Sequence, residues 1–512
     1  MSRPDLLVPT RRLRHYLLTS PLAFLLLVFP GHRILGAKPA PKPVPVAVDE
    51  SIQSLVDRNP RGTTFLIKAG IHRLQSVVPK DGDSFLGETG AVLNGALLLS
   101  SFQRQGQYWV ASASAEVSQP AGKCASDSPV CWLPEDLFVD DVPLRHQARL
   151  AEVGPGKWFM DYAGGKVYLA DNPEGHKVEL SQARHALSGS ADNVTIHGLV
   201  IEKYATPVGH GAIYGGDPSF SQGGGLNRHW IVELNEIRYN HSVGVRTGNE
   251  MQVLRNKLHH NGEYGVGGSG RNILVDGNEI AYNNYAGYDF HWGAGGTKFA
   301  VTDGAVVRNN YVHDNEGPGL WSDIENRNIL YEHNHTKGNR GPGIFHEISL
   351  DAVIRDNIVE EDNLDPSGKE GIWEGAGILI SASSNVDVYG NRVTDCLNGI
   401  IGIQADRGNS KHGATPYQYR LQNLKVHNNV IIQKNGFAAG IVSNPLFAPT
   451  LFTDWNNRFE DNTYQLANST HQYYYWMNSP RTRSEWQAFG NDRNGKWTDI
   501  NASVSAVLDL FR

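Results

Sequence analysis

One short phrase recurs between residues 193 and 464: an Asn followed, two residues later, by a branched apolar residue or Thr. The phrase begins at Asn235, Asn256, Asn278, Asn310, Asn334, Asn357, Asn391, Asn429 and, in a weaker form, Asn462. Neighbouring copies are 21 to 24 residues apart, or 32 to 38 apart where a copy carries an insertion. A short fixed period of this kind indicates a solenoid, in which each copy forms one coil.

A second phrase, Gly followed by an apolar residue, lies in the later part of each copy. It occurs at Gly244, Gly265, Gly287, Gly319, Gly343, Gly377, Gly399 and Gly440, and an Asn stands four residues before each of the first five. Asn tolerates a left-handed backbone and can hydrogen-bond its equivalent in the next coil. No apolar stripe of helical period accompanies the repeat, which disfavours helical and leucine-rich repeats. The sequence therefore predicts parallel strands stacked coil upon coil, with two Asn columns.

These repeats resemble the parallel β-helix repeats of the pectin-lyase-like superfamily, over roughly residues 50–465. The resemblance implies an all-β fold, a right-handed parallel β-helix. Residues 50–99 are similar to the capping helix and first coils with which many members begin, and a solenoid needs such a cap. Residues 100–188 lack the Asn columns and read as hairpins, similar to a small β-rich insertion found in several β-helix glycosidases. The β-helix proper is then expected over 189–465.

Both ends of the chain read differently from the repeats. Residues 1–37 carry four arginines before an apolar run, as in a cleaved signal peptide, although an uncleaved anchor is the alternative. The proline-rich stretch 38–49 is expected to be a stiff linker. Residues 466–512, with an aromatic cluster and a helix expected over Ser503–Phe511, form the C-terminal cap. We therefore expect a monomer that is secreted, periplasmic or at the cell surface, with membrane contact only through an uncleaved N-terminal segment.

Three cysteines are few for an exported protein. Cys124 and Cys131 are close enough in sequence to close a small loop, and the sequence leaves open whether they are bonded. Cys396 falls within a repeat, where we expect a buried thiol. No zinc-binding or redox cysteine pattern is present in the sequence.

Composition narrows the class of ligand. Charged residues make up only 19% of the chain and the formal net charge is −7. Nucleic-acid phosphates select strongly basic surfaces, so a nucleic-acid partner is excluded. A surface built of neutral polar side chains suits sugars, and a polysaccharide is the partner we expect.

Counting outward from each glycine predicts two side-chain columns on one face of the solenoid. The first column would hold Arg246, Asp289, Trp321 and Phe345, and the second His291, Asp323 and Glu347. Coils stack at about 4.8 Å, so these titratable groups would lie side by side. The alternative is a solvated polar ladder without chemistry.

Aromatic and charged residues near these columns complete the predicted site. Trp321 and Trp292 would stack on sugar rings, while Lys298 and Arg340 come from neighbouring loops and Phe345 and Arg246 from the column itself. A glycosidase needs two carboxyl groups about 5 Å apart for retention, or about 6.5–9.5 Å apart for inversion. Asp323 with Glu347 would match the short separation, and Asp289 with Glu347 the long one.

The function expected from this pattern is an exported glycoside hydrolase, with Asp323 and Glu347 as the carboxylate pair and His291 and Asp289 in support. It needs no cofactor or metal. The first alternative is a uronate lyase with a Lys or Arg base and Ca²⁺ bound by carboxylates. The second is a carbohydrate-binding or surface scaffold without turnover.

Overall fold

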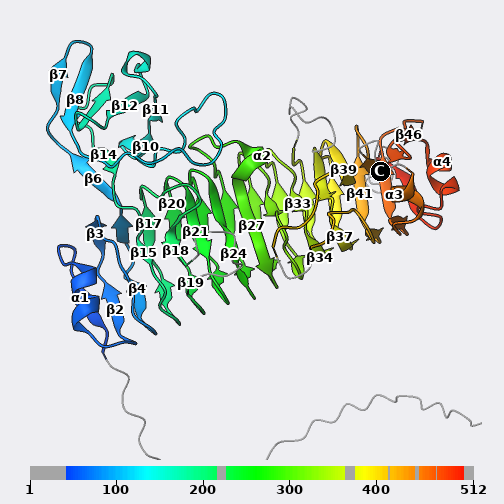
Figure 1. Ribbon diagram of the computed structural model, residues 1–512, viewed down its shortest axis with the longest axis horizontal. Helices are drawn as coiled ribbons and strands as arrows, with labels where there is room; N and C mark the ends of the chain where they lie inside the picture. The colour runs from blue at the N-terminus through cyan, green and yellow to red at the C-terminus, as the bar shows by residue number, and fades with distance from the viewer. Residues whose placement is uncertain are drawn as a thin grey trace, which may run out of the picture. The chain divides into compact units, whose positions relative to one another are not determined.

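The computed structural model describes residues 42–215, 227–363, 375–412, 416–443, 449–468 and 470–500. They belong to one unit, whose strands stack in three long parallel sheets (Figure 1). Successive coils add parallel strands to each sheet, apart from one antiparallel hairpin near the C-terminal end. The predicted solenoid of stacked parallel strands is confirmed.

Within the described residues, sheets A and B each hold 13 strands and sheet C holds 12. Sheet A consists of β1 (Val44–Val46), β2 (Thr64–Ile67), β4 (Ser84–Gly87), β16 (Thr195–His197), β19 (Ile231–Glu233), β22 (Gln252–Leu254), β25 (Leu274–Asp276), β28 (Val306–Arg308), β31 (Ile329–Glu332), β34 (Leu350–Arg355), β37 (Ser384–Tyr389), β40 (Lys425–His427) and β43 (Arg458–Glu460).

Sheet B consists of β3 (Gly70–Arg73), β5 (Ala91–Asn94), β17 (Val200–Glu202), β20 (Glu236–Arg238), β23 (Lys257–His259), β26 (Glu279–Ala281), β29 (Tyr311–His313), β32 (His335–Lys337), β35 (Ile358–Glu360), β38 (Arg392–Thr394), β41 (Val430–Gln433), β44 (Thr463–Leu466) and β47 (Lys496–Asp499). Sheet C consists of β15 (Leu187–Ser188), β18 (Gly211–Tyr214), β21 (Val243–Thr247), β24 (Tyr264–Arg271), β27 (Gly295–Asp303), β30 (Leu320–Ser322), β33 (Ile344–Glu347), β36 (Ala376–Ser381), β39 (Asn398–Gln404), β42 (Ala439–Ser443), β45 (Tyr474–Trp476) and β46 (Ser479–Arg481).

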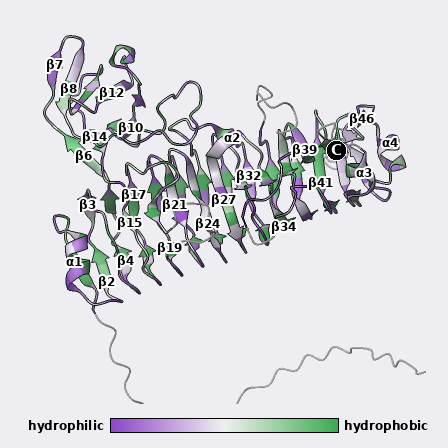
Figure 2. Cartoon of the chain, in the orientation of Figure 1, coloured by the Kyte–Doolittle hydropathy of each residue, from purple (hydrophilic) through white to green (hydrophobic). Residues whose placement is uncertain are grey.

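Inward side chains of the three sheets form one continuous apolar core. Each coil contributes inward-facing residues such as Val275, Ile280 and Phe299, all fully buried. Figure 2 shows the hydrophobic colour following the stacked strands. Alternation along each strand leaves the intervening side chains outside the coil, which is how a solenoid presents residues from successive coils in columns.

Both predicted Asn columns exist and are buried. In the first column, the side-chain amide of Asn278 donates to Asn310 Oδ1 at 3.0 Å and to the Val253 carbonyl at 2.8 Å. The same pattern repeats from Asn235 to Asn462 and ends at the carboxylate of Asp492, 2.9 Å from Asn462 Nδ2. These bonds satisfy backbone groups at the turns, where the strands have no sheet partner.

The first coil is capped by α1 (Ile52–Arg58), which buries Ile52, Leu55 and Val56 against the core. Its N-cap Ser51 accepts a hydrogen bond from the Ser54 backbone N–H at 3.2 Å. The strand β1 already pairs with β2, so the linker predicted over 38–49 cannot extend past residue 43. Residues 1–41 lie outside the described part of the chain, as does the expected helix Ser503–Phe511.

A β-rich insertion interrupts the first coils, as predicted for residues 100–188. It contains a four-stranded sheet of β6 (Ala96–Leu99), β9 (Leu137–Val139), β10 (Val142–Pro143) and β14 (Val178–Ser181), and a five-stranded sheet of β7 (Gln103–Gln105), β8 (Tyr108–Ser112), β11 (Arg145–His146), β12 (Lys157–Asp161) and β13 (Lys166–Leu169). A short 3-10 turn spans Leu150–Glu152. The insertion has its own apolar core around Trp158, Leu169 and Leu180.

The solenoid extends beyond the predicted boundary at residue 465. Strand β47 continues sheet B in parallel with β44, and β45 continues sheet C. The short helices α3 (Thr450–Thr453) and α4 (Arg483–Ala488) also pack on this part of the core, with Trp486 fully buried against Phe459 and Tyr474. The described residues include no helix with the length and apolarity that a membrane crossing requires.

Cys124 and Cys131 are joined by a disulfide, which the sequence left open. Cys396 is a buried free thiol, as expected. The eight-residue stretch that the bond closes belongs to the insertion. Cys131 packs against Tyr288 and Ala294 of the solenoid. The disulfide loop therefore fastens the insertion to the coil that precedes the candidate site.

Candidate active site

Asp323 and Glu347 lie side by side on the outer face of sheet C. Strands β30 and β33 are paired in parallel with Trp321 opposite Phe345 and Ser322 opposite His346. Ser322 and His346 point inward, where the Ser322 hydroxyl and His346 Nδ1 are 2.7 Å apart. The next residues, Asp323 and Glu347, therefore point outward on neighbouring coils, as predicted.

The preceding coil differs from the prediction. Phe299 of β27 pairs with Ser322, which places Lys298 beside Trp321 and Ala300 beside Asp323. Gly296, rather than Gly287, occupies the turn position, since a Cβ there would meet the Gly319 carbonyl at 2.4 Å and Asn315. Lys298 is therefore a member of the first column and not a loop residue, and Asp289 and His291 belong to neither column.

Asp289 and His291 lie in and before α2 (Phe290–Gly293), an excursion between sheets B and C. The Asp289 carboxylate is the N-cap, accepting from the His291 backbone N–H at 3.0 Å, and the two side chains are 3.3 Å apart. His291 is exposed and packs on the Phe290 ring. Their predicted positions in the two outward columns are therefore wrong, because the strand of this 32-residue copy begins at Gly295 and not at Gly287.

Lys298 is the central cation of the site. Its ammonium group lies 3.0 Å from Asp323 Oδ2 and 3.8 Å from the centre of the Trp321 ring, and it donates to the Trp292 carbonyl. Asp323 Oδ1 is buried and receives no hydrogen bond from the described residues. The cation thus orients one carboxylate oxygen and leaves the other with its lone pairs free.

Arg407 is the second cation beside the pair. Its guanidinium forms an ion pair with Glu347 Oε1 and is partly exposed. The loop that carries it is anchored by the buried Glu325, which accepts from the backbone N–H groups of Lys411 and His412 and from the Tyr419 hydroxyl at 2.8 Å. The loop therefore forms one wall of the site.

Glu347 and Asp323 have different electrostatic environments. Burial, followed by the negative charge of Asp323, raises the pKa of Glu347 to about 7, against the opposing effects of Arg407 and Lys298. Both side chains keep only 10% of their surface exposed. The pair thus combines a carboxyl group that retains its proton near neutrality with a carboxylate held by a cation.

Of the two residues of the predicted aromatic platform, Trp321 is sealed and Trp292 is partly covered. Trp321 is 1% exposed, with Lys298 over its ring from one neighbouring coil and Phe345 stacked on it at 5.4 Å from the other. The Trp292 ring lies against Gly122 of the insertion, where an added Cβ would meet it at 2.9 Å. Trp321 therefore offers no open face to a sugar, whereas Trp292 and Phe345 stay partly exposed.

Arg246 and Arg340 lie at the edges of this arrangement. Arg246 is fully buried and its Nη1 donates to the Tyr264 hydroxyl at 3.1 Å. Arg340 is exposed at the rim, 3.2 Å from Glu316 and over the Phe290 ring. Arg246 therefore cannot meet a ligand without displacement of its cover, and Arg340 can.

Comparisons with known proteins agree with this architecture. Residues 223–393 match the family described as the right-handed beta helix region. The protein is a right-handed parallel β-helix. No curated protein matches the sequence.

Solved structures with this β-helix fold include the one described as the complex of XylC with xylose. It is 14% identical, with a TM-score of 0.60, over 87% of this chain and 82% of that chain. The A-module of the mannuronan C-5 epimerase AlgE4 from Azotobacter vinelandii has a TM-score of 0.43 at 12% identity, covering 87% and 92%. Polygalacturonase from Erwinia carotovora ssp. carotovora has 0.36 at 10% identity, covering 83% and 93%.

Sequence reasoning missed three charged residues of the β-helix site. Arg407 and Glu325 are brought in by a loop that has no repeat to place it. Glu263 belongs to the coil before Lys298, is 2% exposed, and accepts from the Gly209 backbone N–H at 2.9 Å and from Ser242. Burial raises the pKa of Glu263. Glu263 stands two residues before the repeat glycine Gly265, and this place in the repeat could have marked it as a candidate site residue.

The β-helix presents no ready metal site in the part of the chain that the structure describes, where no three His, Cys, Asp or Glu side chains gather suitably. The two carboxyl groups, Asp323 and Glu347, are instead arranged for proton transfer. A protonated carboxyl and a carboxylate on adjacent coils can act on the two sides of one bond, with cations beside them.

Proposed function

We propose that the protein is an exported, polysaccharide-active enzyme, a glycoside hydrolase in which Glu347 is the general acid and Asp323 the nucleophile or base. The observation that carries the proposal is the unequal pair: Glu347 with its pKa raised to about 7, next to Asp323 held by Lys298 at 3.0 Å. Glycosidic bonds are cleaved by such a division of roles between two carboxyl groups.

Glu347 would protonate the departing glycosidic oxygen. Its neutral form is favoured by burial, and Arg407 at its edge keeps it in place. Asp323 Oδ1 faces the reacting carbon in this scheme, because Lys298 already binds the other oxygen. Lys298 is thus a positioning residue for the attacking carboxylate.

Retention of the anomeric configuration follows from the spacing of the coils. Strands on adjacent coils lie about 4.8 Å apart, close to the separation of about 5 Å that a direct attack requires. The longer separation would need Asp289, which caps α2 and lies outside the outward columns. We therefore favour a covalent glycosyl intermediate on Asp323.

A uronate lyase is the second candidate, and Lys298 and Arg407 favour it, since two cations beside the carboxylates could neutralise an acidic sugar. A lyase would use Lys298 as the base. Its ammonium group, however, already forms an ion pair with Asp323, lies over the Trp321 ring and donates to the Trp292 carbonyl. These three contacts hold the ammonium group away from the role of a free base, and the hydrolase is therefore the better-supported proposal.

The test is product analysis on a panel of polysaccharides, including xylan because one structural neighbour is described with xylose. A hydrolase gives new reducing ends without ultraviolet absorbance, and a lyase gives unsaturated uronates that absorb. Binding without either product would support a scaffold and overturn the proposal. Export is tested separately by cell fractionation and by sequencing the N-terminus of the mature protein.

A further inference from the structure

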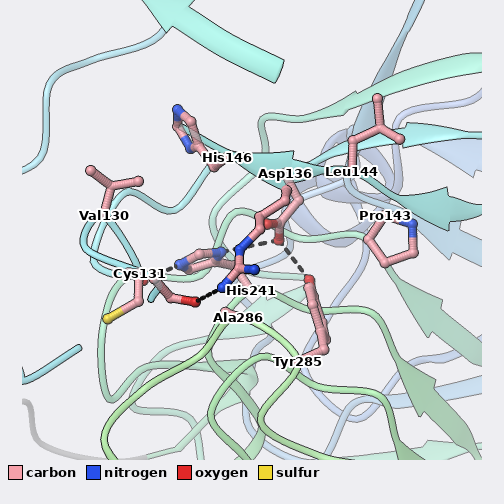
Figure 3. Close-up of a pocket in the computed structure, with 11 residues that line it drawn as sticks. Val130, Cys131, Asp136, Pro143, Leu144, His146, His241, Tyr285 and Ala286 are labelled. Atoms are coloured by element: carbon pink, nitrogen blue, oxygen red, sulfur yellow. Dashed lines mark hydrogen bonds and ion pairs between the residues drawn. The ribbon is translucent and has the colours of Figure 1, made fainter. Parts of the chain in front are cut away.

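A cavity lies between the insertion and the solenoid, apart from the carboxylate pair (Figure 3). Its volume is about 300 Å³, which is at the small end of the range for ligand pockets. The insertion contributes most of the wall, and the solenoid contributes His241, Tyr285 and Ala286. We propose that this cavity binds a single neutral sugar residue, a function beyond the proposed hydrolysis.

The floor of the cavity is a buried hydrogen-bonded cluster around Asp136. Its Oδ2 accepts from His241 Nδ1 at 3.0 Å and from the Tyr285 hydroxyl at 2.6 Å, as Figure 3 shows. His241 Nε2 donates to the Cys131 carbonyl at 2.7 Å. No donor among the described residues binds Asp136 Oδ1, so this oxygen keeps its capacity to accept from a hydroxyl group of a ligand.

The rim supplies donors. Arg145 is held through Nη2, which donates to the Asp127 carboxylate at 2.8 Å and to the Ser128 hydroxyl at 3.1 Å. These contacts fix the guanidinium plane at the cavity while leaving Nε and Nη1 to donate to a ligand. A fixed guanidinium opposite a carboxylate is suited to neighbouring hydroxyl groups, because each hydroxyl both donates and accepts.

Apolar side chains complete the wall. Val130, Pro143, Leu144 and Ala286 line the cavity beside the polar groups. Sugars present C–H faces together with hydroxyl groups, so they need this combination of apolar and polar surface.

Charge balance selects a neutral ligand. Asp136 is paired with His241, whose pKa is raised by the Asp136 charge despite burial, and Arg145 is paired with Asp127. An added anion would face the Asp136 carboxylate, and an added cation would face the Arg145 guanidinium. A neutral polyhydroxylated ring incurs neither repulsion.

The test is titration of the purified full chain with neutral monosaccharides (glucose, galactose, mannose, xylose and arabinose) by calorimetry and saturation-transfer NMR. Glucuronate and glucosamine are the charged comparators. Val130→Trp fills the cavity, and Arg145→Ala removes the rim donor from an exposed position, so it also serves if the larger change disturbs folding. We expect millimolar binding of a neutral sugar, weakened at least about tenfold in both variants, with Lys298→Ala leaving it unchanged.

Three results would overturn the cavity assignment: no neutral sugar binds, only a charged comparator binds, or Arg145→Ala leaves the affinity unchanged. Polysaccharide turnover is measured in parallel. If Asp323→Asn loses turnover but still binds the monosaccharide, the cavity and the carboxylate pair act independently. If the native protein binds the sugar but degrades no polysaccharide, the cavity assignment stands and the proposed hydrolysis fails.

Discussion

The ammonium group of Lys298 lies 3.0 Å from Asp323 Oδ2 and 3.8 Å from the centre of the Trp321 ring, two residues of the following coil. The stacking of coils that sets Lys298 beside Trp321 also sets Glu347 next to Asp323, on the coil after that. Lys298 therefore holds Asp323, while at Glu347 burial and the Asp323 charge outweigh Arg407 and raise the pKa. This asymmetry gives the two groups separate roles.

The first prediction concerns pH. Because burial and Asp323 raise the pKa of Glu347 to about 7, the general acid is protonated below that value and loses its proton above it. We expect kcat/KM to fall about tenfold per pH unit above about pH 7. A pH–rate profile checks this, and Glu347→Gln should show no such alkaline limb in its residual activity. A flat profile to alkaline pH would contradict the acid role.

Removal of the Arg407 side chain should shift the alkaline limb of the pH–rate profile. Arg407 lowers the pKa of Glu347, so Arg407→Gln should raise it and move the alkaline limb upward by about one pH unit. Carbon-13 NMR of labelled glutamate gives the same pKa without a substrate. Arg420→Gln, in the same loop but paired with Gln418, is the control. An unchanged or lowered midpoint in Arg407→Gln would show that the ion pair does not act on Glu347.

Repetition made most of this fold predictable. The Asn phrase gives the coil period, and alternation after Gly319 and Gly343 gives the outward positions of Asp323 and Glu347. The prediction failed at the coil with the 32-residue step. Either Gly287 or Gly296 could occupy the turn position there by sequence, and only the packing contacts of the folded chain identify Gly296. The burial of Trp321 and the ion pair of Arg407 depend on contacts between segments far apart in sequence. The period of the repeat carries no information about such contacts.

The Asn column supports the third prediction. Asn334 Nδ2 donates to Asn357 Oδ1 at 3.0 Å and to the Val307 carbonyl at 2.9 Å. Asn334→Ala leaves buried groups on both neighbouring coils without partners, so we expect a loss of about 3 kcal/mol in the free energy of unfolding. Chemical denaturation measures it, with the exposed Asn172→Ala as control, expected within about 0.5 kcal/mol. Equal stability of the two variants would mean that the ladder is dispensable.

Asp362 ends the second Asn column and carries the fourth prediction. Burial raises its pKa from 3.8 to about 7, although Thr336 and Asn339 donate to it. A raised folded-state pKa stabilises the protein fully below the unfolded value, and this contribution is lost as pH rises through about 7. Asp362→Asn should therefore be more stable than the native protein at about pH 8. The gain is at most about 1.4 kcal/mol for each pH unit that separates the folded-state pKa from the unfolded one.

Thermal unfolding of Asp362→Asn at about pH 5 and about pH 8 supplies the check. The difference in Tm between variant and native protein should be larger at the higher pH. A constant difference across this range would show that Asp362 titrates as an ordinary exposed carboxyl group.

The most direct test of the carboxylate pair is turnover by matched variants on the polysaccharide that the native protein degrades. Asp323→Asn and Glu347→Gln should each lower the release of reducing ends by about 100-fold or more. The control Glu361→Gln removes an exposed carboxylate paired with Lys337 on sheet B and should leave the rate unchanged. If either site variant keeps the native rate, the pair does not catalyse the reaction.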